Sequence, residues 1–319
     1  MKDSLLYYRV GPLLYCPANN ESIAGSIITG RFGCHYSLAL CLEDTIRDDH
    51  VPEAEAALIS SIKKIHGAAS LSRFYIPWIF IRVRTPEQIF ALLCSLGKAA
   101  GLITGFIIPK FSLENADGFI DTVTAVNRSS EQRFYMMPIF ESPTIVHLQS
   151  RYDILYRLKD KLDSIEEYVL NIRVGGNDLC RYFGLRRHSN ESIYGIRPVS
   201  DILSDIITVF GADYVVSGPV WEYYQGDGWE SGLKNELNED RLCGFVGKTV
   251  IHPNQIEFVN SAYKVEKKDY EDARAVLNWN PACDSLVSGS SGRERMNEYK
   301  THDSWALRTV LLSQAYGIK

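Results

Sequence analysis

Residues 133–143 read Arg-Phe-Tyr-Met-Met-Pro-Ile-Phe-Glu-Ser-Pro, and this stretch decides the fold. An apolar and aromatic run ends at the carboxylate of Glu141, and Ser142-Pro143 then opens an amphipathic stretch that reaches about residue 164. A short apolar run is typical of a buried strand, and Ser followed by Pro is typical of a helix start. The stretch therefore predicts a strand, a polar residue at its carboxyl end, and a helix directly afterwards.

The same strand–helix unit recurs on both sides of this stretch. We predict strands at 13–18, 37–44, 78–84, 105–110, 133–141, 168–175, 214–217 and 248–252, and helices at 21–30, 52–69, from 85, 113–127, 142–164, from 177, 198–211, near 230–242, and 254–263. Strands that alternate with helices pair in parallel, and eight such units in about 250 residues match a closed barrel. An open doubly wound sheet is the alternative, but no GxGxxG follows the first strand. We therefore predict an α/β fold, a (β/α)₈ TIM barrel.

The pattern changes after residue 264. Residues 266–280 and 301–316 are expected to be helical, and the polar stretch 283–295, rich in Ser and Gly, predicts a flexible loop between them. We therefore divide the chain into a barrel, residues 1–264, and a C-terminal helical extension, residues 265–319.

Composition and charge exclude several classes of protein. The chain of 319 residues is 45% hydrophobic and 23% charged, as expected for a folded globular protein, and its net charge of −5 argues against nucleic acid as a partner. The seven cysteines include no CxxC pair, which fits a reducing compartment. The N-terminus does not resemble a signal peptide, and no apolar run is long enough to span a membrane. We expect a cytoplasmic protein without a membrane partner.

Polar side chains stand at the carboxyl ends of the predicted strands, where TIM barrels carry their chemistry. They are Glu43 and Asp44, Arg82 and Arg84, Pro109 and Lys110, Glu141, Asn177 and Asp178, and His252. Glu141 and Asp178 suit Mg²⁺, which prefers oxygen ligands and takes one or two carboxylates. The alternative is that each carboxylate caps the helix that follows it.

Arg82 alternates with apolar neighbours in its strand, so its side chain lies on the same side as that of Phe80. A buried arginine needs a partner, and its planar fork suits a substrate carboxylate. Pairing with Glu43 or Asp44 is the alternative. Pro109, Lys110 and Asn177 are further candidates for substrate contact.

Seven motifs in order then resemble the HpcH/HpaI aldolase and citrate lyase β-subunit superfamily over nearly the whole chain. They are Leu14–Asn19, Leu40–Asp44, Ile81–Arg84, Gly105–Lys110, Pro138–Ser142, Gly175–Leu179 and Gly244–Gln255. Cys41 and Arg84 stand where the family usually has aspartate and asparagine. The resemblance implies a Mg²⁺-dependent barrel that makes or breaks a carbon–carbon bond in a 2-keto acid or an acyl thioester, including CoA-linked ones, through a metal-stabilised enolate.

The resemblance also implies roles for particular residues. Glu141 and Asp178 would bind Mg²⁺, and Arg82 would steady the enolate or carboxylate. Glu43 and Asp44 would order Arg82 and the metal's waters. The family's C-terminal segment packs near a neighbour's active site in trimers or hexamers, so a homotrimer or hexamer is expected.

Departures from the family leave the acid–base group open. No lysine follows closely after Glu43-Asp44, and Met296-Asn297-Glu298 replaces the "MID" aspartate motif of malyl-thioester enzymes. Glu298 is the nearest equivalent acid, with Asp303 in reserve. The replaced motif weakens the case for thioester hydrolysis, so an acyl-CoA thioesterase or synthase is the second hypothesis. A non-catalytic ligand-binding homologue is the third, and the intact Glu141, Asp178 and Arg82 disfavour it. The aromatic stretch Trp221–Asn238 either shapes the substrate pocket or forms a packed surface loop.

Overall fold

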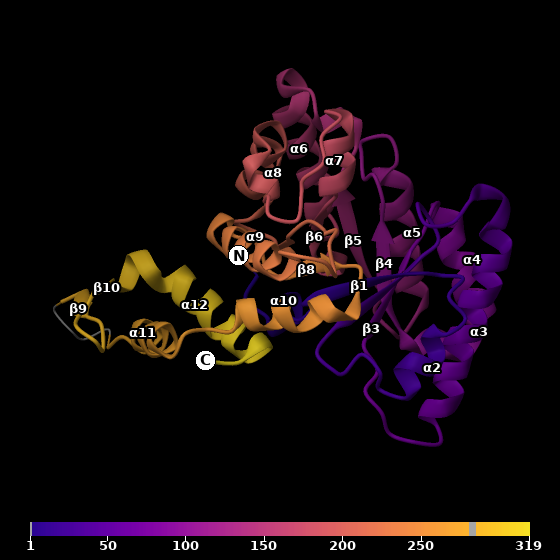
Figure 1. Cartoon of the computed structure of the whole chain (residues 1–319), viewed down its shortest axis with the longest axis horizontal. Coiled ribbons are helices and arrows are strands. Elements are labelled where there is room, and N and C mark those ends of the chain that lie inside the picture. The colour runs from indigo at the N-terminus through magenta and orange to yellow at the C-terminus, as the bar shows by residue number, and fades with distance from the viewer. Residues whose placement is uncertain (1, 281–284) are drawn as a thin grey trace.

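Eight parallel strands form one sheet that curves into a barrel in the computed structural model, which describes residues 2–280 and 285–319 (Figure 1). The strands are β1 (Pro12–Pro17), β2 (Ser37–Cys41), β3 (Trp78–Arg82), β4 (Ile103–Ile108), β5 (Tyr135–Phe140), β6 (Ile172–Val174), β7 (Val216–Ser217) and β8 (Lys248–Val250). Their order is β7-β6-β5-β4-β3-β2-β1-β8, and a bridge from Gly218 to Lys248 joins the two outer strands. The predicted (β/α)₈ barrel is confirmed, and the doubly wound alternative is wrong because neighbours in the sheet follow chain order.

Most helices follow the strands and cover the outside of the barrel, but the first precedes β1 and the last two lie beyond the barrel (Figure 1). They are α1 (Leu5–Tyr8), α2 (Ile23–Ile28), α3 (Val51–Ala69), α4 (Pro86–Leu96), α5 (Ala116–Ser129), α6 (Leu148–Asp163), α7 (Gly176–Tyr182), α8 (Arg197–Phe210), α9 (Trp229–Cys243), α10 (Ile256–Tyr263), α11 (Lys267–Leu277) and α12 (Tyr299–Tyr316). The helix expected from residue 142 begins as a short 3-10 turn, Pro143–Ile145, before α6. The strand expected at 168–175 is shorter, because Glu166–Tyr168 form another such turn.

The barrel interior is apolar at one level and polar at the next. Leu13, Ala39, Phe80, Ile107 and Met137 pack together inside the strands as one buried cluster. Arg82 follows Phe80 by two residues, so its side chain lies on the same interior side, nearer the strand ends. A larger cluster of buried residues fills the space between strands and helices. The polar layer therefore rests on a packed apolar base.

A buried ion network joins β8 to α9 on the outside of the barrel. Lys248 Nζ lies 2.9 Å from Glu236 Oε1 and 2.7 Å from Asp240 Oδ2, and all three side chains are fully buried. Burial raises the pKa of Asp240 to about 6, an effect that the Lys248 ammonium partly offsets. The network fixes β8, the strand that meets both β1 and the bridge to Gly218.

We expect Lys248→Met to destabilise the protein by about 3–5 kcal/mol, because it leaves the buried Asp240 carboxylate without its cation and Glu236 with Arg187 as its remaining cation. Urea unfolding measures this loss. Lys161→Met is the matched control, since Lys161 pairs with Asp117 on the surface, and such a pair contributes less than about 1 kcal/mol. Equal losses in the two variants would contradict a structural role for the network.

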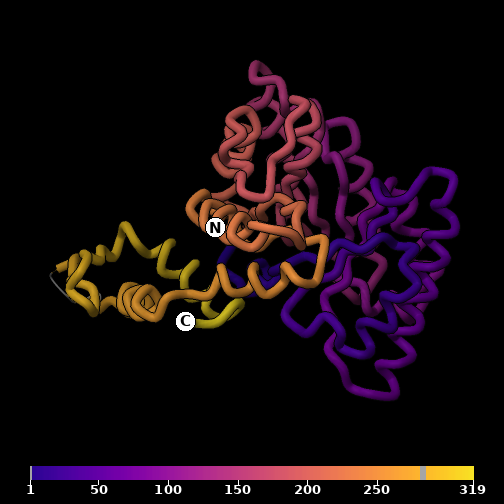
Figure 2. Tube along the Cα trace, in the orientation of Figure 1, coloured from indigo at the N-terminus to yellow at the C-terminus, as the bar shows by residue number. Residues whose placement is uncertain are grey.

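The chain beyond α10 forms an arm that projects from the barrel (Figure 1). The arm comprises α11, the hairpin β9 (Val287–Gly289) and β10 (Met296–Glu298), and α12. At its base Val265 pairs with Ile318, and Figure 2 shows the C-terminus close to the start of the arm. Residues 283 and 284 of the expected loop lie outside the described residues, and its later part forms the hairpin. Whether 264 is a domain boundary stays a prediction.

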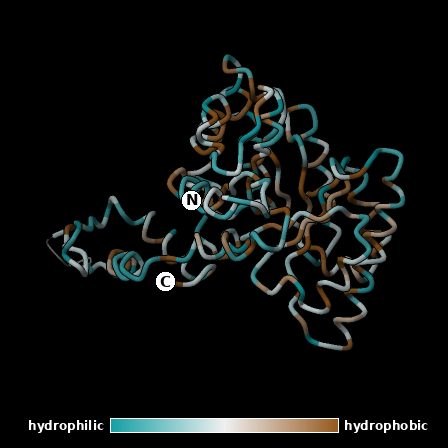
Figure 3. The backbone as a smooth tube through the Cα atoms, in the orientation of Figure 1, coloured by the Kyte–Doolittle hydropathy of each residue, from teal (hydrophilic) through white to brown (hydrophobic). Residues whose placement is uncertain are grey.

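Helix α12 joins the arm to the amino ends of the barrel strands. Leu311 packs in one cluster with Tyr8, Val215 and Val246, and Arg308 donates a 2.6 Å hydrogen bond to the carbonyl of Gly244. Figure 3 shows hydrophobic stretches gathered in the barrel, whereas much of the arm is hydrophilic. Among the described residues, no helix combines the length and apolar character needed to cross a membrane.

Candidate active site

A cavity of about 320 Å³ opens at the carboxyl ends of the strands, the end at which TIM barrels carry their chemistry. Its lining comes from the ends of most strands and from the loops that follow them. The residues are Tyr15, Asp44, Thr45, Arg82, Ile139, Glu141, Arg173, Val174, Gly175, Gly176, Asn177, Asp178, Val220, Thr249 and Ile251. Polar and charged side chains thus converge on one cavity.

Glu141 follows β5 directly and is only 2% exposed. Its Oε1 accepts hydrogen bonds from Arg82 Nη2 at 3.1 Å and from the backbone N–H of Lys110 at 3.2 Å. Burial raises the pKa of Glu141 to about 7; Arg82 opposes this rise, and the nearby Asp178 carboxylate adds to it. The alternative that Glu141 caps a helix is not observed, since Ser142 accepts the hydrogen bond from Thr144 N.

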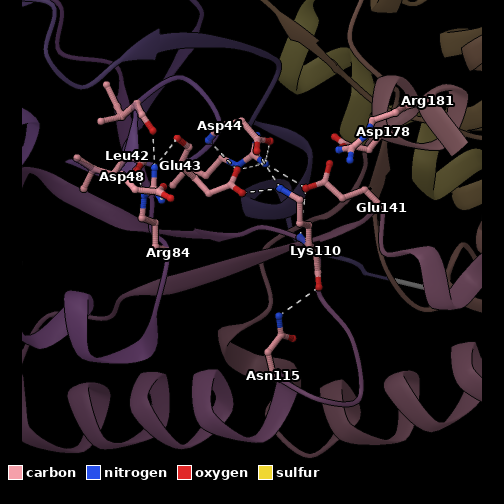
Figure 4. A network of polar contacts seen from close by, with 12 residues as sticks. Leu42, Glu43, Asp44, Asp48, Arg84, Lys110, Asn115, Glu141, Asp178 and Arg181 are labelled. Atoms are coloured by element: carbon pink, nitrogen blue, oxygen red, sulfur yellow. Dashed lines mark hydrogen bonds and ion pairs between the residues drawn. The ribbon is translucent and has the colours of Figure 1, made fainter. Parts of the chain in front are cut away.

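Asp178 lies in the first turn of α7, and Figure 4 shows it beside Glu141. The helix begins at Gly176 with no side-chain cap, so Asp178 does not cap it. Asp178 is partly exposed, and Arg181 Nη1 lies 4.0 Å from its Oδ1. Asn177, the expected substrate contact in the same turn, also lines the cavity.

Arg82 holds three carboxylates together. Its Nη2 lies 2.5 Å from Glu43 Oε2, 2.8 Å from Asp44 Oδ2 and 3.1 Å from Glu141 Oε1. Burial by itself lowers the pKa of Arg82, but its anionic neighbours raise it above its ordinary value, so the guanidinium stays charged. The structural pairing considered for Arg82 is therefore present, and the same side chain also lines the cavity.

Lys110 completes this network from the end of β4 (Figure 4). Its Nζ lies 2.5 Å from Glu43 Oε1 and 2.9 Å from Asp44 Oδ1, and these bonds raise its pKa although burial opposes the rise. Its φ of 48° is rare for a residue with a side chain, and its N–H donates to Glu141. Lys110 therefore orders the carboxylates from both its backbone and its side chain.

The donor set fits Mg²⁺ held by two carboxylates. Glu141 is buried beside Asp178, and the negative charge of Asp178 disfavours ionisation of Glu141. A dication between them would remove that repulsion. Within residues 2–280 and 285–319, no group of three or more His, Cys, Asp or Glu side chains is arranged to hold a metal. Mg²⁺ prefers six oxygen ligands. Water and substrate would therefore supply those that the two carboxylates do not.

Several predicted residues lie outside the cavity lining. Glu43, Pro109 and Lys110 are not part of it, so direct substrate contact by Pro109 or Lys110 stays a prediction. Glu298 lies on the arm, where its Oε2 accepts a hydrogen bond from Thr301. Asp303, the reserve acid, lies nearby in α12.

The two tryptophans of the aromatic stretch after β7 are packed into the molecule, whereas residues 224–228 between them are exposed. Trp221 is fully buried, and its ring lies 5.1 Å from the guanidinium carbon of Arg187. Trp229 is 8% exposed and begins α9, and Tyr224 stacks on His252. Val220, which directly precedes the stretch, is part of the cavity lining.

Four polar residues of the cavity were not singled out from the sequence: Tyr15, Thr45, Arg173 and Thr249. Arg173 carries the signal that identified Arg82, a charged residue flanked by apolar ones in a strand. Burial raises the pKa of Tyr15 to about 12, so its phenol stays protonated.

We expect Gly175→Ala to displace Glu141. A Cβ at position 175 would lie 1.9 Å from Glu141 Oε2 and 2.4 Å from Glu141 Cβ. A misplacement of about 1 Å at a catalytic group costs about 100-fold in rate, so Mg²⁺ affinity and kcat/KM should both fall. Gly67→Ala in α3 is the control, because nothing lies within 4 Å of its Cβ. It should leave both values unchanged and stabilise by about 0.5–1 kcal/mol; matching losses in both variants would contradict the prediction.

Comparison with solved structures supports the fold over almost the whole chain. CitE from Mycobacterium tuberculosis in complex with magnesium, acetoacetate and coenzyme A is 16% identical, with a TM-score of 0.62 over 97% of this chain and 99% of that chain. A citrate lyase from Burkholderia xenovorans LB400 is 14% identical, with a TM-score of 0.71 over 97% and 93%. The citrate lyase β subunit from M. tuberculosis with oxaloacetate and magnesium is 17% identical, with a TM-score of 0.53 over 82% and 99%. At these identities the likeness shows the fold alone.

A search of curated protein sequences finds no match. A family model described as "C-C_Bond_Lyase of the TIM-Barrel fold" matches residues 4–318. The predicted resemblance to citrate lyase β-subunit-like proteins is thereby confirmed. The chain belongs to the C–C bond lyase family of the TIM-barrel fold.

Proposed function

We propose that this protein is a Mg²⁺-dependent carbon–carbon bond lyase that acts on a 2-keto acid or an acyl thioester through a stabilised enolate. The observation that carries the proposal is the pair Glu141 and Asp178 in the lining of one cavity at the carboxyl ends of the strands, beside a permanently charged Arg82. Magnesium complexes of the related M. tuberculosis proteins add support.

Glu141 and Asp178 would hold the metal, which when bound supplies Lewis-acid stabilisation of the negative charge on the substrate. The hydrogen bonds from Arg82 and from Lys110 N–H fix Glu141 in place. Arg82 faces the same cavity, so its guanidinium stabilises the charge that develops as the bond breaks. Glu43 and Asp44 hold Arg82 in this position before substrate arrives.

The arm bears on where Glu298 could act. Helix α12 packs against the amino ends of the strands, whereas the cavity opens at their carboxyl ends. Glu298, at the far end of that helix, would therefore act only in the cavity of another copy, within a homotrimer or hexamer. A CoA-thioester cleavage that is lost specifically in Glu298→Ala would favour the acyl-CoA alternative.

Calorimetric titration with Mg²⁺ and then with pyruvate or oxaloacetate tests the proposal. We expect wild type to bind pyruvate or oxaloacetate only when Mg²⁺ is present. Glu141→Ala should bind neither Mg²⁺ nor the two acids. If wild type binds neither Mg²⁺ nor the acids, the result contradicts the metal–enolate hypothesis.

A further inference from the structure

Arg173 is a buried arginine at the bottom of the cavity. It lies in β6, is 1% exposed, and is part of the cavity lining. Its Nη2 donates a 2.7 Å hydrogen bond to Thr249 Oγ1, and its Nη1 donates a 3.3 Å hydrogen bond to Asn171 Oδ1. Its Nε has no partner among residues 2–280 and 285–319. The guanidinium therefore keeps unused donors in a space that a small molecule can enter.

The other deeply buried cations of the described chain face carboxylates. Arg82 contacts three of them, Arg187 and Lys248 share Glu236, and Arg151 pairs with Asp205. Arg173 has only neutral partners in the part of the chain that the structure describes. Burial lowers its pKa, which reflects the cost of a charge that no anion compensates. A buried charge of this kind needs an opposite charge, and none of its protein contacts supplies one.

The register of the sheet places Arg173 below the metal-binding carboxylates. Arg173 pairs with Ile139 on the neighbouring strand, and Glu141 follows Ile139 by two residues. Two residues advance a strand by about 7 Å, so the backbone of Arg173 lies about 7 Å deeper in the barrel than that of Glu141. Tyr15 lines the same cavity as Arg173 and Glu141. Burial raises the pKa of Tyr15, and the charges of Arg82 and Arg173 both oppose that rise. A ligand that reaches Glu141 with one end is therefore able to reach Arg173 with the other.

We propose that Arg173 and Thr249 form an anion subsite on the cavity floor that binds a second carboxylate of the substrate, so that the enzyme prefers dicarboxylates to monocarboxylates. The proposal rests on the proposed function for the end of the substrate held near Glu141. The chemistry favours a carboxylate because the flat guanidinium fork matches its two oxygens. Thr249 already accepts a hydrogen bond from Arg173, which leaves its own O–H free to donate. Arg173 acts here as a specificity-determining residue.

The first test is made without metal, with succinate as the probe, because succinate has two carboxylates and no keto group. In EDTA, succinate should raise the Tm of wild type and leave that of Arg173→Met unchanged. Succinamate, in which an amide replaces one carboxylate, should protect wild type less. An equal Tm rise in the variant, no rise in wild type, or protection by inorganic phosphate in place of succinate would overturn the carboxylate subsite.

The second test compares oxaloacetate with pyruvate in the presence of Mg²⁺. In Arg173→Met the preference for oxaloacetate over pyruvate should fall by at least about tenfold, because the buried donors that contact the second carboxylate are gone. The affinities of the variant for Mg²⁺ and for pyruvate should stay unchanged. An unchanged preference would overturn the inference. If wild type binds neither acid with Mg²⁺, the proposed function fails, and the succinate test in EDTA still decides the role of Arg173.

Stability without ligand provides a matched control for folding. Arg173→Met removes an uncompensated cation and should melt at or above the wild-type Tm. Arg187 is as deeply buried but faces Glu236, so Arg187→Met should melt lower. A similar fall in both variants would identify Arg173 as a structural residue and overturn the proposal.

Discussion

Glu141→Gln is expected to abolish Mg²⁺ binding and to lower kcat/KM by about 1000-fold or more. The Lewis acid contributes several kcal/mol to transition-state stabilisation, and about 4 kcal/mol corresponds to that factor. The amide keeps an oxygen that can accept from Arg82 and Lys110 but lacks the charge that holds a dication. Calorimetry with Mg²⁺ and steady-state kinetics measure the two effects.

Two further variants show whether the loss belongs to the metal site. Asp178→Asn should reproduce both effects. Glu167→Gln should reproduce neither, since Glu167 pairs with Arg133 on the surface. The folded state of Glu141→Gln should be as stable as wild type, because the change removes a buried charge. Wild-type Mg²⁺ affinity in Glu141→Gln would contradict the assignment.

Arg82→Met is expected to remove activity and to destabilise the protein by about 3–5 kcal/mol, the usual effect of breaking a buried pair from one side. The variant leaves Glu43, Asp44 and Glu141 close together, and among the described residues Lys110 is then the cation that compensates them. Mutual repulsion then adds to the loss of hydrogen bonds. Urea unfolding measures the destabilisation, and added Mg²⁺ should recover part of it by neutralising Glu141.

The control for Arg82 is a surface arginine with a comparable partner. Arg47 pairs with Asp49 at 2.6 Å, but both side chains are largely exposed. Arg47→Met should therefore change stability by less than about 1 kcal/mol and leave activity intact. If Arg82→Met unfolds at the same urea concentration as Arg47→Met, the network around Arg82 does not hold the site together.

The sequence predicted those parts of the site that follow from strand periodicity. Parallel strands bring their carboxyl ends to one edge, so Glu141 and Asp178 could be placed together without knowing any contact between them. The interior orientation of Arg82 followed from alternation with Phe80. The sequence could not decide whether Arg82 pairs with Glu43 or binds substrate, because the same guanidinium contacts Glu43 and lines the cavity.

The features that the sequence did not predict depend on contacts between distant segments. Lys110 adopts its left-handed backbone where its N–H meets Glu141, a residue 31 positions away. Strand β6 is short, and Arg173 lies in its middle rather than at its end, so it does not belong to the polar residues at the strand ends. The hairpin of the arm is held by Arg295, which reaches Asp272 at 2.7 Å. The preferences of individual residues for helix, strand or turn carry no information about these pairings.

The amino ends of the barrel strands are covered by both ends of the chain, with Tyr8 against Leu311, and β1 pairs with β8 as well as with β2. During synthesis the first strand is therefore made long before either its second neighbour or the helix that covers its base. We expect the nascent chain to remain sensitive to protease until α12 has left the ribosome, and the last step of folding to be the docking of that helix.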